Sequence, residues 1–476
     1  MIVGAGLGGL SAALHLAGAG RDVTVFERSG EPGGRCGRWQ VDGYSFDTGP
    51  TVLTMPEAVE RPLAAVGESL AQWLPLRRLD PAYRARFADG STLDVLADPA
   101  AMAEQIRREC GAADAAGFER LVSWLGELYR LELPHFIDRN LDSPTQLLRP
   151  PLARLAQMGA FRRLAPKIGA FVRDERLRRL FSFQAMYAGL APQQALAVYA
   201  VIAYLDSVNG VYFPDGGMHA LPRALAGAAR KHGVRIHYNR MVNRVEVNNS
   251  RATAVIVDDE RVEADVVVIN ADRPGAEATL LGRRTRRLTY SPSCAVLHAG
   301  SDVTFSDPAH HVIDFGAAWD STFDEVIVKG ATMSDPSFLL TTPTITDPSL
   351  APPGRHGYYA LFPVPNLEHS RPIDWTSAGA CYQDAILSTL DARGYPGLAN
   401  AEVLRLTTPA DWRDQGLAGG TPFSAAHTFR QTGPFRPATL DALLDNVVFC
   451  GSGTQPGVGV PMVLLSGGLA AKRVTG

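Results

Sequence analysis

Three glycines near the start of the chain are spaced for binding a phosphate group. Gly4, Gly6 and Gly9 form the pattern Gly-x-Gly-x-x-Gly directly after the apolar pair Ile2-Val3. Glycines at these positions allow a tight turn, the close approach of a pyrophosphate, and the packing of a helix on a strand. The helix that follows would offer free N–H groups and its positive dipole end to the phosphates. These residues predict a dinucleotide site.

An acidic residue follows at the distance expected of a ribose ligand. Residues 21–26 alternate like a second strand, and Glu27 stands at its end. A carboxylate there accepts hydrogen bonds from the ribose hydroxyls and disfavours the 2′-phosphate of NADP.

A second glycine turn favours a flavin cofactor over a nicotinamide. Glu27-Arg28 is followed by Gly33-Gly34-Arg35, which resembles flavin enzymes of the glutathione-reductase type, where the Arg lies near the pyrophosphate. A surface loop with a solvated Arg35 is the alternative. No second Gly-x-Gly-x-x-Gly with flanking strand and helix follows, so we expect the substrate itself to donate the electrons.

A glycine-rich segment near the end of the chain could meet the flavin ring. Residues 446–450 form an apolar strand, residues 451–459 a glycine-rich turn, and Pro461 can begin a helix without losing a hydrogen bond. The N-terminus of that helix would stabilise negative charge on a reduced flavin. A tightly packed terminal helix is the simpler interpretation, and both can hold.

The elements that must position these motifs are spread over the whole chain. A chain of 476 residues suits about two domains. Short apolar segments at 234–238, 242–247, 252–257 and 266–269 are expected to return to the nucleotide-binding domain, and Asn270-Ala-Asp272 closes the last one. Residues 291–432 contain strand-like and proline-rich segments that predict a second, sheet-containing domain.

Residues 102–205 have a helical pattern. Apolar residues from Leu152 to Phe171 recur at three- and four-residue steps, which predicts an amphipathic helix that Pro166 kinks or restarts. A basic amphipathic helix can lie on an anionic bilayer, and a solvated face over a core is the alternative. The basic residues of this stretch are Arg149, Arg154, Arg162, Arg163, Lys167, Arg173, Arg176, Arg178 and Arg179.

Composition argues against several other classes of protein. The net charge of −3 provides no basic footprint for nucleic acid. The five cysteines are scattered without a C-x-x-C pair, so we expect reduced thiols, no disulfide frame and no metal site. No apolar run is long enough for a spanning helix, and no signal peptide is recognisable. We expect a cytoplasmic protein that is soluble or lies on a membrane.

Several motifs together resemble those of bacterial and fungal phytoene desaturases, along nearly the whole chain. They are VGAGLGGLSAALHLA at 3–17, PGGRCGR at 32–38, FSFQAMYAG at 181–189, GVYFPDGGMH at 210–219, DPS at 347–349, QTGPFRP at 431–437 and GSGTQPGVGVP at 451–461.

The expected fold class is α/β. The resemblance implies a discontinuous, Rossmann-like FAD-binding domain of the glutathione-reductase and amine-oxidase type, formed by residues 1–75, 210–285 and 440–476. A sheet-containing substrate-binding domain would comprise residues 76–101 and 286–439. Residues 102–209 would form a helical subdomain that is a candidate for membrane contact.

The resemblance also implies a reaction. FAD would be the sole redox cofactor, and a phytoene-like C40 polyene would be desaturated towards lycopene. Electrons would pass to a quinone or to oxygen, and the protein would lie peripherally at the inner face of the membrane. A desaturase, isomerase or ketolase acting on another carotenoid is an alternative. A lipid or prenyl escort protein on the same scaffold and an amine oxidase are further alternatives.

The site residues implied by the resemblance fall into two groups. Arg149 resembles an Arg proposed near the reacting end of the substrate tunnel, but Thr145 or Gln146 stands where some relatives have an acid. Because no carbonyl acidifies the protons, we expect hydride to leave first, and no single side chain to be indispensable as a base. The expected FAD contacts are Gly4, Gly6, Gly9, Glu27, Arg28, Gly34, Arg35, Val242, Gly453, Val460, Pro461 and Met462.

Overall fold

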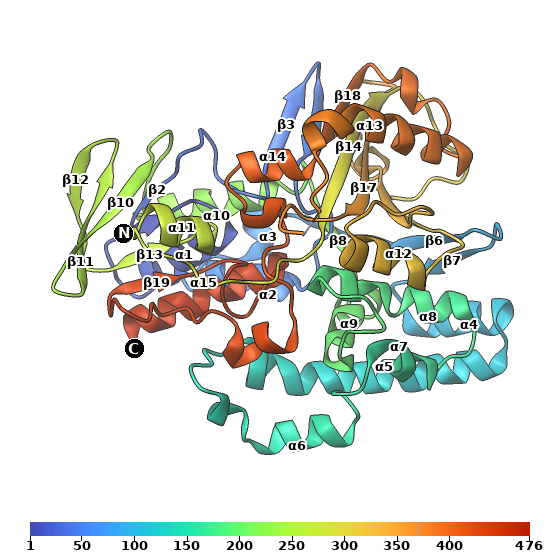
Figure 1. Cartoon of the computed structure of the whole chain (residues 1–476), viewed down its shortest axis with the longest axis horizontal. Helices are drawn as coiled ribbons and strands as arrows, with labels where there is room; N and C mark the ends of the chain where they lie inside the picture. Colours follow the sequence, from blue (N-terminus) through green and yellow to red (C-terminus); the bar gives the residue numbers. More distant parts are fainter. Residues whose placement is uncertain (370) are drawn as a thin grey trace.

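Two main sheets and a layer of helices make up the molecule (Figure 1). The computed structural model describes residues 1–369 and 371–476. In Figure 1 the five-stranded sheet lies at the left, the seven-stranded sheet at the upper right, and the helices between residues 99 and 207 below. Both ends of the chain lie at the left side.

The five-stranded sheet carries the first glycine turn. Its strand order is β19-β13-β1-β2-β9, and every neighbouring pair is parallel. Parallel strands that are covered on both faces are apolar throughout, as the short strand β1 shows. The strands are β1 (Ile2–Val3), β2 (Thr24–Phe26), β9 (Arg235–His237), β13 (Val267–Ile269) and β19 (Val447–Phe449).

Different layers cover the two faces of this sheet, because successive side chains of a strand point to opposite faces. Ile2 packs in the core with helices α1 (Leu7–Gly18) and α15 (Val460–Thr475). Val3 packs with a three-stranded antiparallel sheet. The predicted strands at 242–247 and 252–257 therefore return as a covering layer, outside the parallel sheet. That layer consists of β10 (Val242–Asn248), β11 (Arg251–Val257) and β12 (Glu260–Glu263).

The seven-stranded sheet joins distant parts of the chain. Its order is β18-β14-β17-β16-β15-β6-β7, and all neighbours are antiparallel except β15 and β6. Helix α13 (Trp375–Ala392) packs against it through Trp375, Ile386 and Leu390. The strands are β6 (Tyr83–Phe87), β7 (Thr92–Val95), β14 (Ser293–Ser301), β15 (His311–Phe315), β16 (Phe338–Thr341), β17 (His356–Val364) and β18 (Val403–Thr407).

The smaller elements connect these layers. Two strand pairs, β3 with β4 and β5 with β8, lie outside the larger sheets. Their bounds are β3 (Arg38–Val41), β4 (Tyr44–Asp47), β5 (Leu76–Arg78) and β8 (Tyr212–Pro214). The other helices around the sheets are α2 (Pro56–Ala64), α3 (Leu70–Trp73), α10 (Ala220–Lys231), α11 (Arg273–Thr279), α12 (Asp320–Asp324) and α14 (Pro409–Asp414).

The helical region is broken differently from the prediction. Two helices occupy the stretch from Leu152 to Phe171, so the helix restarts and is not merely kinked, but the new helix begins at Leu164, before Pro166. Gly159 lies between them with φ +75°, a left-handed conformation that ends a helix. Pro166 falls in the first turn of the second helix, where its missing N–H is tolerated. The helices are α4 (Pro99–Glu109), α5 (Ala112–Glu132), α6 (Pro150–Gln157), α7 (Leu164–Gly169), α8 (Glu175–Leu180) and α9 (Val201–Ser207).

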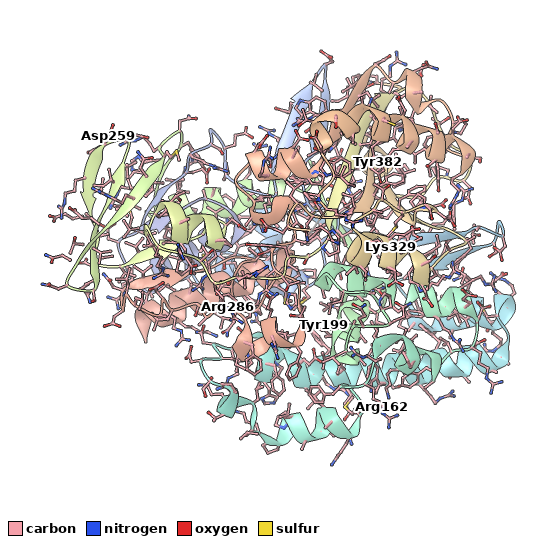
Figure 2. The ribbon with its side chains drawn as sticks, viewed as in Figure 1. Arg162, Tyr199, Asp259, Arg286, Lys329 and Tyr382 are labelled. Carbon is pink, nitrogen blue, oxygen red and sulfur yellow. The ribbon has the colours of Figure 1, made fainter. Side chains whose placement is uncertain are left out.

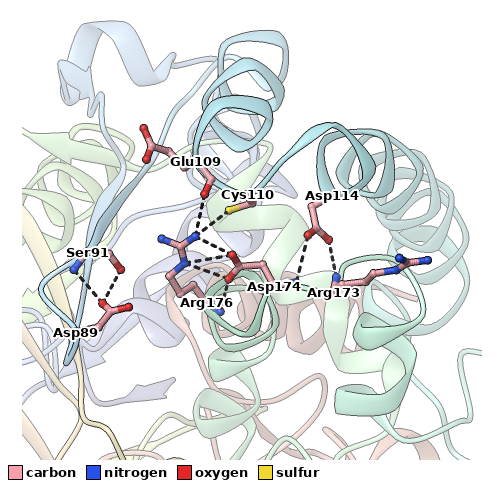
Figure 3. Close-up of polar contacts among 8 residues, drawn as sticks. All are labelled: Asp89, Ser91, Glu109, Cys110, Asp114, Arg173, Asp174 and Arg176. Atoms are coloured by element: carbon pink, nitrogen blue, oxygen red, sulfur yellow. Dashed lines mark hydrogen bonds and ion pairs between the residues drawn. The ribbon is translucent and has the colours of Figure 1, made fainter.

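Part of the basic charge in this region is paired within the protein (Figure 3). Asp174 accepts the Arg176 N–H at 2.8 Å, which caps α8, and its carboxylate forms an ion pair with the Arg176 guanidinium at 2.7 Å. Asp114 accepts the N–H of Arg173. Arg154 pairs with Glu127 at 2.6 Å. The Arg154–Glu127 pair joins α6 to α5, and the ion pairs of Arg154 and Arg176 reduce the positive charge offered to a partner.

Among the described residues, no helix combines the length and the apolar character needed to cross a bilayer.

Candidate cofactor site

The first glycine turn packs as its spacing predicts. A Cβ on Gly9 would overlap the carbonyl oxygen of Gly4, so only glycine lets α1 approach β1 this closely. Gly4 has φ +96° and donates its N–H to the Phe26 carbonyl at 2.8 Å. A Cβ on Gly6 would lie 2.6 Å from Nδ2 of Asn270. No side chain caps the N-terminus of α1, so its N–H groups remain open to an anion.

The Glu27 carboxylate is fixed at the end of β2, beside the glycine turn. Its two oxygens accept the N–H of Ala5 at 2.7 Å and the N–H of Ser29 at 2.9 Å. A carboxylate has about four acceptor positions, so capacity remains for the ribose hydroxyls. Arg28 turns away and donates to the Gln415 carbonyl at 2.6 Å.

Arg35 joins three segments that are far apart in the sequence. Its guanidinium donates to the hydroxyl of Ser452, in the last glycine-rich turn, and to the carboxylate of Asp272. All three segments follow strands of one parallel sheet, and the carboxyl ends of such strands form the binding edge. Gly34 lies against Gly6, with a Cβ position 3.4 Å from the Gly6 Cα.

The last glycine-rich turn is tied to the helix that it precedes. The Ser466 hydroxyl accepts the Gly451 N–H at 3.1 Å and donates to the Gln455 carbonyl at 2.7 Å. A Cβ on Gly453 would lie 3.0 Å from the Cβ of Arg273.

Helix α15 begins at Val460, so Val460, Pro461 and Met462 form its first turn. Its preceding residue Gly459 has φ +110°, and no side chain caps this N-terminus. The predicted terminal helix is therefore present with an open end, which can interact with negative charge.

Two other predicted residues are placed differently. Val242 is 6% exposed and packs with Val3 and Phe26, the residues that directly precede Gly4 and Glu27, and its contact with FAD stays a prediction. Arg149 precedes the first residue of α6, and Figure 1 shows α6 at the lower edge, away from the five-stranded sheet. Its role near the reacting end of a substrate stays a prediction.

Sequence reasoning missed the residues that hold the turns together. Asn270 follows β13, and its amide lies where Cβ atoms on Gly6, Gly8 or Gly451 would be placed. Ser452 and Asp272 meet only through Arg35. The one signal for them was their place directly after predicted strands.

The residues present fit a dinucleotide with a redox ring. They supply two glycine turns without room for side chains, two open helix N-termini, a fixed carboxylate and a guanidinium at one sheet edge. Residues 7–475 match the family described as flavin containing amine oxidoreductase.

The chain belongs to this family. Together with the dinucleotide site described above, membership of this flavin family identifies the cofactor of the chain as FAD.

Curated relatives match this chain over nearly its full length. It is 56% identical to a phytoene dehydrogenase of Streptomyces griseus, covering 100% of this chain and 95% of the relative. It is 38% identical to a zeta-carotene-forming phytoene desaturase of Myxococcus xanthus, over 100% and 93% of the two chains. A lycopene-forming phytoene desaturase of Pseudescherichia vulneris is 33% identical, over 98% and 96%.

Solved structures share the fold of this chain at low identity. An oxidoreductase from Methanosarcina mazei matches with TM-score 0.62 and 17% identity, over 98% of each chain. A redesigned putrescine oxidase matches with TM-score 0.61 and 17% identity, over 99% and 98%. A Rab GDI from Plasmodium falciparum matches with TM-score 0.59 and 10% identity, over 99% and 97%. Because oxidases and a Rab GDI share it, this fold by itself does not separate an enzyme from an escort protein.

Proposed function

We propose that this protein is an FAD-dependent desaturase of a phytoene-like C40 polyene, acting towards lycopene. The observation that carries the proposal is 56% identity with a phytoene dehydrogenase over the whole chain. The edge of the five-stranded sheet that carries the glycine turns, Glu27 and Arg35, called the FAD edge below, is also intact. The relatives' names differ in product, one forming zeta-carotene and another lycopene. The number of double bonds introduced is therefore a quantity to be measured.

When bound, FAD supplies the acceptor for the hydride that leaves the polyene. The protein's residues bind the cofactor and orient it towards the polyene. The open N-termini of α1 and α15 would stabilise the negative charge of the cofactor, Glu27 would accept the ribose hydroxyls, and Arg35 would lie near the phosphates. We assign no single side chain as the base that takes the proton.

The electrons would leave to a quinone or to oxygen, and the protein would work on the cytoplasmic face of a membrane. A long polyene dissolves in a bilayer, and two apolar side chains flanking α6 are exposed: Leu148 by 77% and Phe161 by 42%. Arg162, next to Phe161, lies at the same lower edge in Figure 2. Apolar side chains beside arginines are typical of a surface that lies on anionic lipid.

The test of the reaction is anaerobic mixing of the FAD-loaded protein with phytoene in liposomes. Bleaching of the oxidised-flavin band near ~450 nm, with a longer polyene in the extract, is the expected result. Bound FAD that does not bleach would reject phytoene and leave another carotenoid as the substrate. A protein that takes up no FAD would contradict the enzyme assignment and return the escort alternative.

The test of membrane contact is flotation with anionic vesicles. The double variant Leu148→Glu/Phe161→Glu should stay with the vesicles far less than the wild type, because charge replaces the apolar contact. Leu443→Glu is the matched control, since Leu443 is 67% exposed but lies just before β19. Equal loss in both variants would contradict a surface around α6.

A further inference from the structure

One arginine is buried in the protein without a carboxylate partner. Arg436 is 2% exposed and is the largest of the fully buried side chains. Its guanidinium donates only to backbone carbonyls: to Ser452 at 2.6 Å, Thr454 at 3.1 Å, Ala425 at 3.2 Å and Gln431 at 3.4 Å. Within residues 1–369 and 371–476, no acidic side chain forms an ion pair with it.

Other arginines in enclosed positions are paired with acids. Arg273 pairs with Glu277 at 3.0 Å, and Arg393 with Asp314 at 2.6 Å. A buried charge without a counter-ion is costly, so most proteins pair it. At Arg436, carbonyl dipoles replace the counter-ion, and the net charge remains uncompensated.

Burial disfavours the charged forms of the ionisable groups around Arg436. Burial and the Arg436 charge hold the pKa of His427 well below its usual range, and burial raises the pKa of Tyr199 to about 12. Glu132, whose charge would act on Tyr199, is buried with an unpartnered carboxyl oxygen, and burial raises its pKa well above the usual value. Burial lowers the pKa of Arg436 itself to about 10, so it stays charged at neutral pH. Burial therefore disfavours the charged forms of His427, Tyr199 and Glu132, whereas the Arg436 guanidinium stays charged.

The position of this charge links it to the FAD edge. Ser452 and Thr454 belong to the glycine-rich turn that leads into α15, and Ser452 also receives Arg35 on its hydroxyl. A Cβ on Gly457, two residues before the cap of α15, would lie 3.7 Å from the Arg436 guanidinium carbon. Figure 2 shows the neighbouring Tyr199 in the middle of the molecule, between α9 and the C-terminal segments. The guanidinium therefore lies under the turn that carries the open N-terminus of α15.

We propose that Arg436 is a positioning residue that fixes this turn and supplies a permanent positive charge, which favours the reduced, anionic form of the bound flavin. A fixed charge in a water-excluded site acts strongly because little solvent screens it. Its field adds to the positive end of the α15 dipole. The inference depends on bound FAD and on no particular polyene, so rejection of phytoene as substrate would leave it intact.

The test compares Arg436→Met and Arg436→Lys as FAD-loaded proteins. The readouts are the flavin midpoint potential and the dissociation constant for sulfite, which adds to the flavin and leaves negative charge on the ring. Arg436→Met should have a more negative potential and at least about tenfold weaker sulfite binding, since one nearby charge commonly shifts such equilibria by that factor. Arg436→Lys keeps the charge and loses the planar fork. It should hold FAD more weakly but keep a potential and sulfite affinity close to the wild type.

Arg393→Met is the control for loss of an enclosed arginine, because Arg393 lies after α13 against the seven-stranded sheet. It should leave both readouts unchanged. A wild-type potential in FAD-loaded Arg436→Met would overturn the proposal. If Arg436→Met does not retain FAD, Arg436→Lys decides: a clearly more negative potential despite the retained charge would overturn it, and a wild-type potential would support it.

Discussion

At the scale of single residues, the FAD-binding edge of the sheet requires glycines, because a Cβ atom would not fit at these positions. Gly9 has no space for a Cβ, because the Gly4 carbonyl occupies that position. Gly9→Ala should therefore push α1 away from β1 and weaken FAD binding by at least about tenfold, the effect of roughly 1.4 kcal/mol. FAD titration followed by fluorescence measures this.

The control for this change is Gly379→Ala. Gly379 lies in α13, and a Cβ there would be 4.0 Å from its nearest neighbour outside the helix, a methyl of Thr408. Alanine in a helix interior is more favourable than glycine by about 0.5–1 kcal/mol, so this variant should be as stable as the wild type or slightly more stable. Equal FAD affinity in Gly9→Ala and Gly379→Ala would contradict the packing argument.

A buried acid on α9 should make stability depend on pH. Asp206 is 2% exposed, and burial raises its pKa to about 7, although the Ser207 hydroxyl donates to it at 2.8 Å. The folded state therefore holds this proton more tightly than the unfolded state. The resulting stabilisation is complete below about pH 4 and is lost as pH rises through about 7.

Asp206→Asn removes this titration. Relative to the wild type, the variant should gain about 4 kcal/mol in unfolding free energy between pH 4 and pH 8. Denaturant unfolding of both proteins across that range provides the measurement. A difference between them that stays constant with pH would show that Asp206 ionises normally.

At the scale of elements, α15 packs against α1 through two adjacent glycines, Gly467 and Gly468. Gly467 faces the backbone of α1, whereas Gly468 faces a side chain. A Cβ on Gly467 would overlap the Gly8 carbonyl and lie 2.7 Å from the Ser11 Cβ, whereas a Cβ on Gly468 would meet only the His15 ring at 3.1 Å. Gly467→Ala must separate two backbones and should cost about 1–3 kcal/mol in unfolding free energy.

Gly468→Ala is the matched variant in the same helix. The His15 side chain can rotate away, and alanine favours the helix, so its unfolding free energy should change by less than about 1 kcal/mol. Thermal unfolding of the two FAD-loaded variants separates them. Similar melting temperatures would mean that the helices are less closely held than their packing indicates.

The elements that could be predicted from the sequence are those with a local signal. Gly4, Gly6 and Gly9 predict a turn between strand and helix, and Pro461 predicts the start of α15; both are confirmed. These signals act within a few residues, so one sequence is enough to read them.

The features that could not be predicted depend on contacts between distant segments. Nothing near Asn270 shows that its amide will lie against Gly6, and nothing near Arg436 shows that four carbonyls will enclose it. The error in the helical region was of another kind. The apolar pattern continues through Gly159, so periodicity alone hides a break that needs one residue with positive φ.

At the scale of the whole molecule, one glutamine connects the helical region to the FAD edge. The Gln455 amide accepts the Leu141 N–H at 3.0 Å and donates to the Leu141 carbonyl at 2.7 Å and the Gly433 carbonyl at 3.2 Å. Gln455→Ala would leave the buried backbone groups of Leu141 unpaired, at about 1–3 kcal/mol for each group.

We expect Gln455→Ala to lose FAD faster and to show faster amide hydrogen exchange around residues 138–147. Gln193→Ala is the control, since Gln193 bonds only to the exposed Asp320 among the described side chains. Mass spectrometry of exchanged peptides measures the effect. Unchanged exchange in this segment would show that the other contacts, such as the Asn140 amide with the Leu469 carbonyl, are sufficient.

The order of strands in the five-stranded sheet has a consequence for biosynthesis. Ile2 of the central strand β1 pairs with Val268 of β13, and Val268 in turn pairs with Val448 of β19, so β13 lacks one neighbour until nearly all of this sequence has left the ribosome. The face of α1 that packs against α15 also stays uncovered until then, and exposed apolar segments of this kind aggregate or recruit chaperones. FAD can bind and stabilise only chains in which β19, the last strand, has been made. The supply of riboflavin in the cell should therefore control how much of this protein survives proteolysis, as well as how fast it works.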